Sequence, residues 1–313
     1  MNKNRLVMAV DGGATKTTLV IYSKDQEKLF EKTSTGSNYH AIGTEKVEKV
    51  ITDLLLDAYQ AIPHENIEIV AFAMAGIDTD YDLSTVKAII EKAFNNVPFH
   101  IHTIIVENDV LSTLKGITAG KPGALILSGT GSIAYAINSE GTIVRTGGFG
   151  HRAADEGSGY WIGQQIIRAV VKCEDGRSKE HTILKDLLYE KLQVNHLGEM
   201  LTWLYRSEYT NAQVAGISSI LIDAVNRGDT IAKEIALNAA LELTNLAETT
   251  LQKINITNEP FTLYLNGGIL QNHSIIRRLF IENMRRSYPN LSFELCKEQP
   301  IQYIVNRALY EMK

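Results

Sequence analysis

One arrangement of strands and glycine turns occurs twice in this chain, and it limits the possible folds more than any other feature. Short apolar runs bounded by turn residues predict strands. The first set of such runs lies at 6–10, 18–22 and 29–33. The second set begins after Pro122 and lies at 124–127, 133–137 and 142–145. In each set, a turn containing two glycines joins the first strand to the second. An internal duplication, with one copy in each of two domains, is the simplest explanation.

Each copy continues with helical and strand patterns. In the first copy, Thr44 is expected to cap a helix, and further helices are predicted at 83–94 and 110–119. Its remaining strands are predicted at 67–74 and 101–106. In the second copy, strands near 263–265 and 291–295 follow a mostly helical insertion at about 157–255. The best helical patterns of this insertion are 162–171, 213–226 and 230–254.

The predicted fold class is therefore α/β, with two βββαβα units that face a central cleft. A length of 313 residues suits two domains of ordinary size. We place the first domain at 1–120 and the second, with its helical insertion, at 121–300. A helix at about 301–313 is expected to pack back on the first domain. A cleft between two domains is a common place for a ligand.

Composition excludes several classes of function. Hydrophobic residues make up 44% of the chain and charged residues 21%, which predicts a globular protein with a substantial core. The net charge of −5 and the lack of a basic cluster argue against a nucleic-acid partner. Cys173 and Cys296 are far apart and signal neither a zinc site nor an iron–sulfur cluster. No apolar run approaches the ~20 residues that span a bilayer, and we expect a cytoplasmic protein.

The first glycine turn combines a carboxylate with a candidate phosphate site. Its residues are Asp11, Gly12, Gly13, Ala14, Thr15, Lys16 and Thr17. Glycines allow positive φ and close approach of a ligand to the backbone, whose N–H groups then form an anion site. A carboxylate beside phosphate implies a bridging cation, so Asp11 is predicted to hold Mg²⁺ rather than merely to cap a turn. Thr15 rather than glycine precedes Lys16, which excludes a P-loop, and Lys16 is equally consistent with a solvated turn residue.

The second glycine turn contains Gly129, Thr130 and Gly131. Taken alone, it is equally typical of an ordinary hairpin. Its correspondence to the first turn favours phosphate binding, with Thr130 able to donate both its hydroxyl and its N–H. We therefore expect a nucleoside triphosphate to be held between the two turns.

Several further motifs, in this order and spacing, make the chain resemble a known family. They are Ser37-Asn38, Glu107-Asn108-Asp109, Gly147-Gly148-Phe149-Gly150-His151, Asp155-Glu156-Gly157-Ser158-Gly159-Tyr160-Trp161-Ile162-Gly163 and Asn266-Gly267-Gly268, together with the two glycine turns. The chain resembles the N-acetylglucosamine kinase and BadF/BadG-type ATPase family, within the actin-like (RNase H-like) superfamily of sugar kinases. It departs from the family pattern at Ala14, where a third glycine is usual, and at Tyr303-Ile304, where a Gly-Ala pair is usual.

The resemblance implies ATP and Mg²⁺ as cofactors and an amino sugar as substrate. It implies that Gly216, Gly267 and Gly268 lie beside the adenosine. Asp109 is our choice of general base, because a carboxylate must accept the proton of the attacking hydroxyl. The alternative is that Asp109 caps the helix that follows it. Glu107 is the second choice of base, although a metal or structural role suits it better.

Sugar contacts are predicted from residues of both domains. They are Asn38, Gly76, Asp109, Gly148, Phe149, Gly150, His151 and Asp155. An amide and a carboxylate suit a polyhydroxylated ligand. Glu156 contacts the sugar or caps the next helix. Phe149, Tyr160 and Trp161 are expected to pack in the core, with the alternative that one of them lines the pocket of the acetamido group. His273 and Arg277 are expected to be solvated.

The leading hypothesis is ATP-dependent phosphorylation of N-acetylglucosamine at its 6-hydroxyl. N-acetylmuramic acid and glucosamine are alternative substrates within the family, and His151 or Arg152 offers a positive group for a lactyl carboxylate. A non-kinase ATPase with a cluster between subunits would need paired cysteines, which this chain lacks. A sugar-sensing regulator is the third alternative. The resemblance also implies a homodimer.

Overall fold

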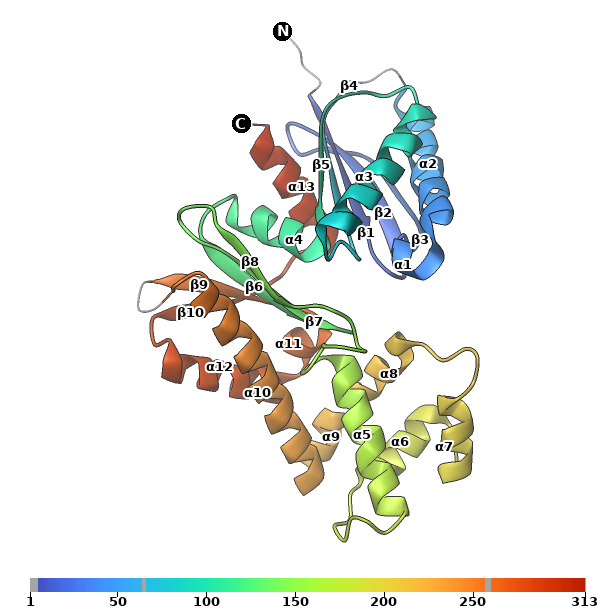
Figure 1. The fold of residues 1–313 in the computed structure, drawn as a ribbon, viewed down its shortest axis with the longest axis vertical. Coiled ribbons are helices and arrows are strands. Elements are labelled where there is room, and N and C mark those ends of the chain that lie inside the picture. The colour runs from blue at the N-terminus through green and yellow to red at the C-terminus, as the bar shows by residue number, and fades with distance from the viewer. Residues whose placement is uncertain (1–4, 64–65, 257–259, 313) are drawn as a thin grey trace. The chain divides into compact units, whose positions relative to one another are not determined.

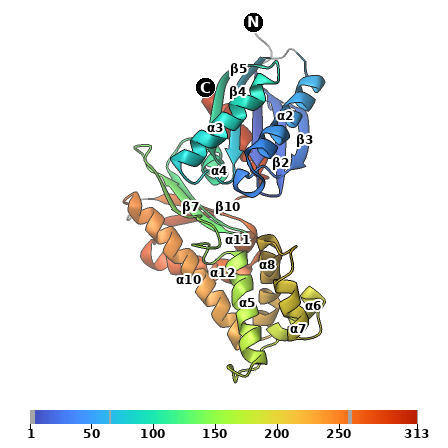
Figure 2. The same cartoon turned by 45° about the vertical axis from the view of Figure 1, so that its right-hand side comes forward.

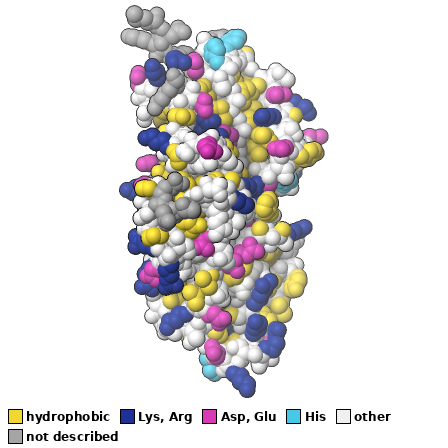
Figure 3. Space-filling model, turned by 60° about the vertical axis from the view of Figure 1, so that its left-hand side comes forward, with side chains coloured by type: hydrophobic (Ala, Val, Ile, Leu, Met, Phe, Trp, Pro, Cys, Tyr) yellow, Lys and Arg dark blue, Asp and Glu magenta, His cyan; other side chains and the backbone are white. Residues whose placement is uncertain are grey.

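The computed structural model describes residues 5–63, 66–256 and 260–312. The chain divides into two compact units, the first of Met1–Lys121 with Lys297–Lys313 and the second of Pro122–Cys296. Among the described residues, none of the helices combines the length and the apolar character needed to traverse a bilayer. On the face drawn in Figure 3, acidic and basic side chains are interspersed.

The first unit is built on a five-stranded sheet in the order β3-β2-β1-β4-β5. Its strands are β1 (Leu6–Gly12), β2 (Lys16–Ser23), β3 (Lys28–Thr35), β4 (Asn66–Met74) and β5 (His100–Asn108). The first three strands form an antiparallel meander, whereas β4 pairs in parallel with both β1 and β5. The first glycine turn follows β1, and Gly76 follows β4. Both therefore lie at the carboxyl ends of parallel strands, where ligands of open α/β sheets bind.

Helices cover both faces of this sheet (Figures 1 and 2). Leu6, Met8 and Val10 of β1 pack in one cluster with α2 (Thr44–Ala61) and α3 (Asp80–Asn95). Val7 and Ala9 belong to a cluster on the opposite face with α13 (Pro300–Glu311). The alternation follows from the two-residue period of a strand, and it explains why β1 is apolar throughout.

The second unit repeats the topology of the first. Its sheet has the order β10-β9-β6-β7-β8, with strands β6 (Gly123–Ser128), β7 (Ser132–Ile137), β8 (Ile143–Gly147), β9 (Phe261–Asn266) and β10 (Leu291–Leu295). The meander is antiparallel and β9 is parallel to β6 and β10, as in the first unit. Gly76, after β4, and Gly267, after β9, have φ of +89° and +88°, so the two copies match even in a local turn.

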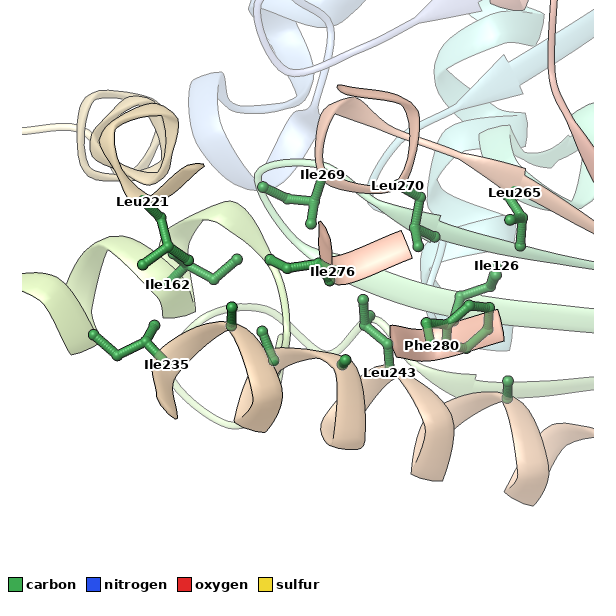
Figure 4. Packing of buried hydrophobic residues seen from close by; sticks show 14 of the residues in the cluster. Ile126, Ile162, Leu221, Ile235, Leu243, Leu265, Ile269, Leu270, Ile276 and Phe280 are labelled. Carbon is green, nitrogen blue, oxygen red and sulfur yellow. The ribbon is translucent and has the colours of Figure 1, made fainter. Parts of the chain in front are cut away.

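A set of helices lies between β8 and β9 of the second unit. They are α5 (Gly159–Glu174), α6 (Leu184–Leu192), α7 (Leu197–Leu204), α8 (Asn211–Ile217), α9 (Leu221–Asn226) and α10 (Thr230–Lys253). Two more, α11 (Gly268–Asn272) and α12 (Ser274–Ser287), separate β9 from β10. Figure 4 shows Ile162 of α5, Leu243 of α10 and Phe280 of α12 in one core with Ile126 of the sheet.

Several local predictions need correction. Thr44 is the first residue of α2, whose cap is Gly43 without a side-chain hydrogen bond. The helix predicted at 213–226 is divided into α8, a 3₁₀ turn at Ser218–Ile220 and α9. The sequence interpretation also missed α1 (Tyr39–Ile42), a single turn in the expected polar loop. Helices of one or two turns are difficult to recognise in a sequence, because each face of such a helix is occupied by only one or two residues.

The C-terminal helix α13 belongs to the first unit and crosses α4 (Asp109–Thr118) very closely. A Cβ on Gly116, inside α4, would lie 1.9 Å from the carbonyl oxygen of Tyr303. The Tyr303 hydroxyl accepts hydrogen bonds from the N–H groups of Lys297 and Glu298 at 3.0 Å each. Tyr303 departs from the family pattern, and its hydroxyl holds the segment that leads into α13.

Gly116→Ala is expected to lower the free energy of unfolding by about 1–3 kcal/mol, because the added methyl forces α4 and α13 apart. Denaturation of the variant and wild type, followed by circular dichroism, measures this. Gly198→Ala in α7 is the matched control, because its Cβ meets the flexible His196 side chain at 3.2 Å rather than backbone. Equal stability of Gly116→Ala and wild type would contradict the close crossing.

Candidate functional site

The first glycine turn owes its glycines to close packing rather than to unusual backbone angles. A Cβ on Gly12 would lie 2.4 Å from the Met74 sulfur and 2.6 Å from the Ser37 hydroxyl oxygen. Neither Gly12 nor Gly13 has positive φ, so the expected use of positive φ is wrong at both. The same holds for Gly129 and Gly131 of the second turn. Alanine at position 14 also has no positive φ, which explains how the chain tolerates this departure.

The segment after β3 supports this turn. The Ser37 N–H donates to the Gly13 carbonyl, and the Gly13 N–H donates to the Lys16 carbonyl, both at 3.0 Å. Ala14, Thr15 and Lys16 are exposed, whereas Thr17 is buried. The buried hydroxyl oxygens of Thr17 and Ser37 have no hydrogen-bond partner among the described residues. Exposed backbone and unpaired polar atoms at one turn suit a polar ligand.

Two carboxylates of the first unit influence each other. Burial raises the pKa of Asp11 to about 6, against the opposing charge of Lys16. Burial and then the charge of Asp11 raise the pKa of Asp109 to about 6, although the Val110 N–H opposes the shift. The Asp11 carboxylate accepts no hydrogen bond from any residue that the structure describes. A largely buried carboxylate that accepts no hydrogen bond from the described residues is a ligand of the kind that a divalent cation prefers, so Asp11 fits Mg²⁺.

Asn108 fixes where Asp109 points. Its side-chain oxygen accepts from the N–H groups of Val110 at 3.0 Å and Leu111 at 3.3 Å, so it caps α4. Its Nδ2 donates to the carbonyl of Ile77 at 3.2 Å. The alternative in which Asp109 is the cap is therefore wrong. Asp109 is the first residue of α4, at the end of the parallel strand β5. Its carboxylate accepts only from the neighbouring Val110 N–H at 3.0 Å within the described chain, which leaves an oxygen for a substrate proton.

Glu107 has a structural role. Its carboxylate accepts hydrogen bonds from Lys115 at 2.6 Å and from two guanidinium nitrogens of Arg307 at 3.1 Å each. Burial raises its pKa, but the bonds from Arg307 and Lys115 outweigh this effect and hold the pKa below the usual range. An ionised group whose oxygens are already bonded is a poor base. Glu107 joins β5 to α4 and α13, and Asp109 is left as the candidate base.

Asn38 and Gly76 lie against each other. A Cβ on Gly76 would be 2.9 Å from the Asn38 Oδ1, and Gly76 has a φ of +89°. Oδ1 of Asn38 accepts from the His40 N–H at 3.0 Å and caps α1. Because Oδ1 is committed, Asn38 presents its Nδ2, which donates to no described residue. The two predicted sugar contacts of the first unit therefore come together, with a free amide donor.

In the second unit, the segment after β8 holds the second glycine turn. The Ser132 N–H donates to Asp155 Oδ1 at 3.1 Å, and the Gly159 N–H donates to the Gly129 carbonyl at 2.8 Å. A Cβ on Gly131 would lie 2.8 Å from Asp155 Oδ1. Asp155 is buried and has a φ of +73°, a strained conformation that often marks functional sites. Its carboxylate therefore supports the turn directly, in addition to the predicted sugar contact.

The loop at 147–151 carries exposed groups. Phe149 is 61% exposed, so the expectation that it packs in the core is wrong. The Arg145 guanidinium lies 4.8 Å from the centre of its ring and donates to the carbonyls of Gly147 and Gly148 at 3.0 and 2.6 Å. Tyr160 and Trp161 do pack against the core. His151 Nδ1 lies 2.8 Å from Asn211 Nδ2. Glu156 is exposed, and Ser158 rather than Glu156 caps α5.

A cavity of about 500 Å³ lies wholly within the second unit beside the second turn. Small residues form much of its lining, namely Gly129, Gly159, Ala212, Ala215, Gly216 and Gly268, with the polar residues Thr130, Ser218, Ser219, Asn272 and His273. A Cβ on Gly216 would meet nothing within 4 Å. Packing therefore gives no reason for a glycine inside α8, and a ligand remains as the reason. Gly267, by contrast, packs tightly on Ser128, whose backbone would lie 2.4 Å from its Cβ.

Two predictions of solvated side chains are wrong. His273 is 5% exposed, and burial lowers its pKa to about 4. Arg277 donates to the carbonyls of Leu270 and Gln271 at 2.8 and 2.6 Å, at the end of α11. The sequence interpretation also missed Asp82, which forms a capping box with Thr79 at the start of α3. The pattern Thr79-x-x-Asp82 could have revealed this box, because it matches the usual capping-box spacing.

Two units with the same sheet topology define a two-domain protein of the actin-like fold class. The chain belongs to the BadF/BadG/BcrA/BcrD ATPase family, whose model matches residues 9–291. It is 30% identical over 289 residues to the N-acetylmuramic acid/N-acetylglucosamine kinase of Clostridium acetobutylicum, with 92% of each chain covered. It is 30% identical over 298 residues to the N-acetyl-D-glucosamine kinase of Dictyostelium discoideum, with 91% of this chain and 92% of that one covered.

The comparison with solved structures confirms the predicted fold class. The crystal structure of a candidate N-acetylglucosamine kinase from Chromobacterium violaceum matches with a TM-score of 0.74 at 21% identity, and the match covers 97% of this chain and 99% of that one. At this identity the likeness shows the fold alone. The predicted family resemblance is confirmed by the family match and by the two relatives.

Asp109→Asn is expected to stabilise the protein above pH 6. Because the folded pKa is raised to about 6, the folded state binds the proton more tightly than the unfolded chain, and wild-type stability falls as pH rises from about 4 to about 6. Asparagine removes this loss, so the free energy of unfolding at pH 8 should rise by about 1–3 kcal/mol, and by less at pH 4. Urea denaturation of both proteins in EDTA measures the free energy of unfolding. Asp25→Asn, at an exposed residue, is the control. A variant no more stable than wild type at pH 8 would contradict the raised pKa of Asp109.

Proposed function

We propose that this protein is an ATP-dependent kinase of N-acetylated amino sugars, with N-acetylglucosamine 6-phosphate as the product. The observation that carries the proposal is Asp109, a carboxylate with a raised pKa and a free oxygen at the end of a parallel strand. The two relatives of known name, each aligned over more than nine-tenths of its length, act on this class of sugar.

The residues of the first unit take two roles in this reaction. Asp109 accepts the proton of the attacking hydroxyl, and its raised pKa of about 6 makes it a better base than an ordinary aspartate. Asn38 donates its Nδ2 hydrogen to the sugar. Asp11 would hold Mg²⁺ through water, and the ion would neutralise charge on the phosphates.

The residues of the second unit bind the nucleotide. Its adenosine occupies the cavity beside Gly216 and Gly268, and the phosphates approach Thr130 and the backbone of the second turn. Asp155 keeps this turn in place through the Ser132 N–H. In the first unit, the exposed backbone of Ala14, Thr15 and Lys16 is the part of the first turn that is open to a phosphate group.

N-acetylmuramic acid is the second candidate substrate. This sugar carries a lactyl carboxylate, which needs a positive partner. Arg152 is exposed in the loop after Gly150 and forms no ion pair with any described residue. The name of the Clostridium relative includes both sugars. The expected homodimer and the cytoplasmic location stay predictions.

The proposal is tested by measuring ADP formation with ATP, Mg²⁺ and a panel of free sugars. We expect N-acetylglucosamine to accelerate ADP formation strongly, and Asp109→Asn to reduce the turnover number by a factor of about 10²–10⁴ with ATP affinity unchanged. The wild-type rate at limiting sugar should rise with pH through about 6, as Asp109 ionises. No acceleration by any sugar would refute the kinase, and near-normal turnover by Asp109→Asn would refute the assigned base.

Gly216→Ala tests the nucleotide cavity. Alanine favours a helix over glycine by about 0.5–1 kcal/mol, and the empty space around the Cβ gives no clash, so the variant should be more stable than wild type. The same methyl enters the adenosine site, so the KM for ATP should rise several-fold while the KM for sugar stays the same. An unchanged KM for ATP would place the adenosine elsewhere.

A further inference from the structure

One buried carboxylate joins the two segments that carry the sugar contacts of the first unit. Asp82 lies at the start of α3 and is 5% exposed. Its Oδ2 accepts hydrogen bonds from the N–H groups of Asp78 at 3.0 Å and Thr79 at 2.7 Å. Both donors lie in the loop that follows Gly76. This oxygen therefore holds the loop after β4 against α3.

The other oxygen of Asp82 reaches the loop after β3. Oδ1 accepts a short hydrogen bond from the Tyr39 hydroxyl, and it lies 3.3 Å from His40 Nε2. The rings of Tyr39 and His40 also lie on each other, with centres 4.0 Å apart. These two residues directly follow Asn38, so the Asp82 side chain secures the turn of helix that Asn38 caps.

A single carboxylate thus holds Asn38 beside Gly76. The loop is tied to the candidate base as well, because Asn108 donates to the Ile77 carbonyl between Gly76 and Asp78. Burial raises the pKa of Asp82, but the hydrogen bonds from Tyr39 and Thr79 outweigh this effect and lower it, so Asp82 stays ionised. A permanently charged acceptor makes hydrogen bonds about twice as strong as those between neutral groups.

We propose that Asp82, acting through Tyr39 and His40, is the positioning residue that sets the sugar-binding donor of Asn38. The inference rests on the proposed function, because it assumes that Asn38 binds sugar. Asp82 does not touch the sugar itself. Its two oxygens fix the two backbone segments whose separation decides where the Asn38 amide lies.

A metal ion is the competing explanation of this cluster. His40, Asp78 and Asp82 each have a ligand atom within 4.8 Å of the others. However, a carboxylate has about four lone-pair sites, and the hydroxyl groups of Tyr39 and Thr79, two backbone N–H groups and His40 already converge on Asp82. Oδ2 already accepts three hydrogen bonds and Oδ1 accepts one beside His40, so the arrangement favours hydrogen bonding at Asp82 over a cation.

Tyr39→Phe is the decisive variant, because it removes the Oδ1 hydrogen bond and leaves the capping box of α3 intact. We expect the KM for sugar to rise about fivefold, as for the loss of one hydrogen bond, with the turnover number and the KM for ATP unchanged. Asp82→Asn should raise the KM for sugar at least as much. Amide hydrogen exchange at 38–43 in the sugar-free protein should become faster in both variants.

Two controls separate positioning from general damage. Tyr81→Phe makes the same chemical change on a 75% exposed side chain of α3 and should alter neither constant. Thr79→Ala weakens the α3 cap, so it should lower stability without raising the KM for sugar as Tyr39→Phe does. A wild-type protein without sugar-dependent ADP formation would refute the proposed function, whereas hydrogen exchange would still test the link to Asp82.

Three outcomes would overturn the inference. The first is a Tyr39→Phe variant with unchanged KM for sugar and unchanged exchange at 38–43. The second is an equal rise in the KM for ATP and for sugar, which indicates general damage. The third is tight binding of Mn²⁺ or Zn²⁺ by the wild type that is lost in both His40→Ala and Asp82→Asn, which would make the cluster a metal site.

Discussion

The end of β5 is the constraint on which the first unit depends, because three consecutive side chains there serve three separate purposes. Glu107 turns to Arg307 and Lys115 and joins the C-terminal helix to the sheet. Asn108 caps α4 and binds the Ile77 carbonyl. Asp109 is left with a free oxygen and a raised pKa. Removal of the Arg307 charge would leave Lys115 as the remaining cation bonded to the largely buried Glu107 among the described residues, and would therefore destabilise the first unit. The residues that stabilise the first unit and the candidate base are therefore neighbours in sequence, where β5 ends and α4 begins.

The duplicated fold puts similar turns to different uses. Gly76 and Gly267 follow equivalent strands with almost the same φ. Gly76 faces the amide of Asn38, whereas Gly267 packs on the backbone of Ser128. The helices between β8 and β9 add a cavity to the second unit, with Gly216 in its wall. The two copies of one framework therefore differ in their local surroundings, with two carboxylates of raised pKa in the first unit and a cavity in the second.

Much of the fold could be predicted from the sequence, because the inner strands β1, β4, β6 and β7 contain continuous apolar runs between turn residues. The position of β4 and the start of α10 agree with their patterns to within a residue. What could not be predicted depends on tertiary contacts. The sequence does not indicate that Arg307 binds Glu107, because the two residues are two hundred positions apart. His273 follows a polar segment, yet it is buried, because α11 and α12 turn it inward at their junction. Phe149 was expected either in the core or at the sugar, and its exposed side chain excludes the core.

The reason for a glycine is the feature that is most difficult to predict from the sequence. A glycine inside a helix lowers the free energy of unfolding by about 0.5–1 kcal/mol relative to alanine. Each such glycine therefore needs a structural or functional reason, and the sequence does not show which of the two applies. Gly116 and Gly216 occupy similar helical positions. A Cβ on Gly116 would strike the Tyr303 carbonyl, while a Cβ on Gly216 would enter open space in the cavity. One glycine therefore permits two helices to cross and the other leaves room for a ligand. The same distinction applies to Gly12, which is required by Met74 and Ser37 and not by its φ. Three-dimensional contacts therefore distinguish glycines that packing requires, such as Gly12 and Gly116, from Gly216, for which packing gives no reason.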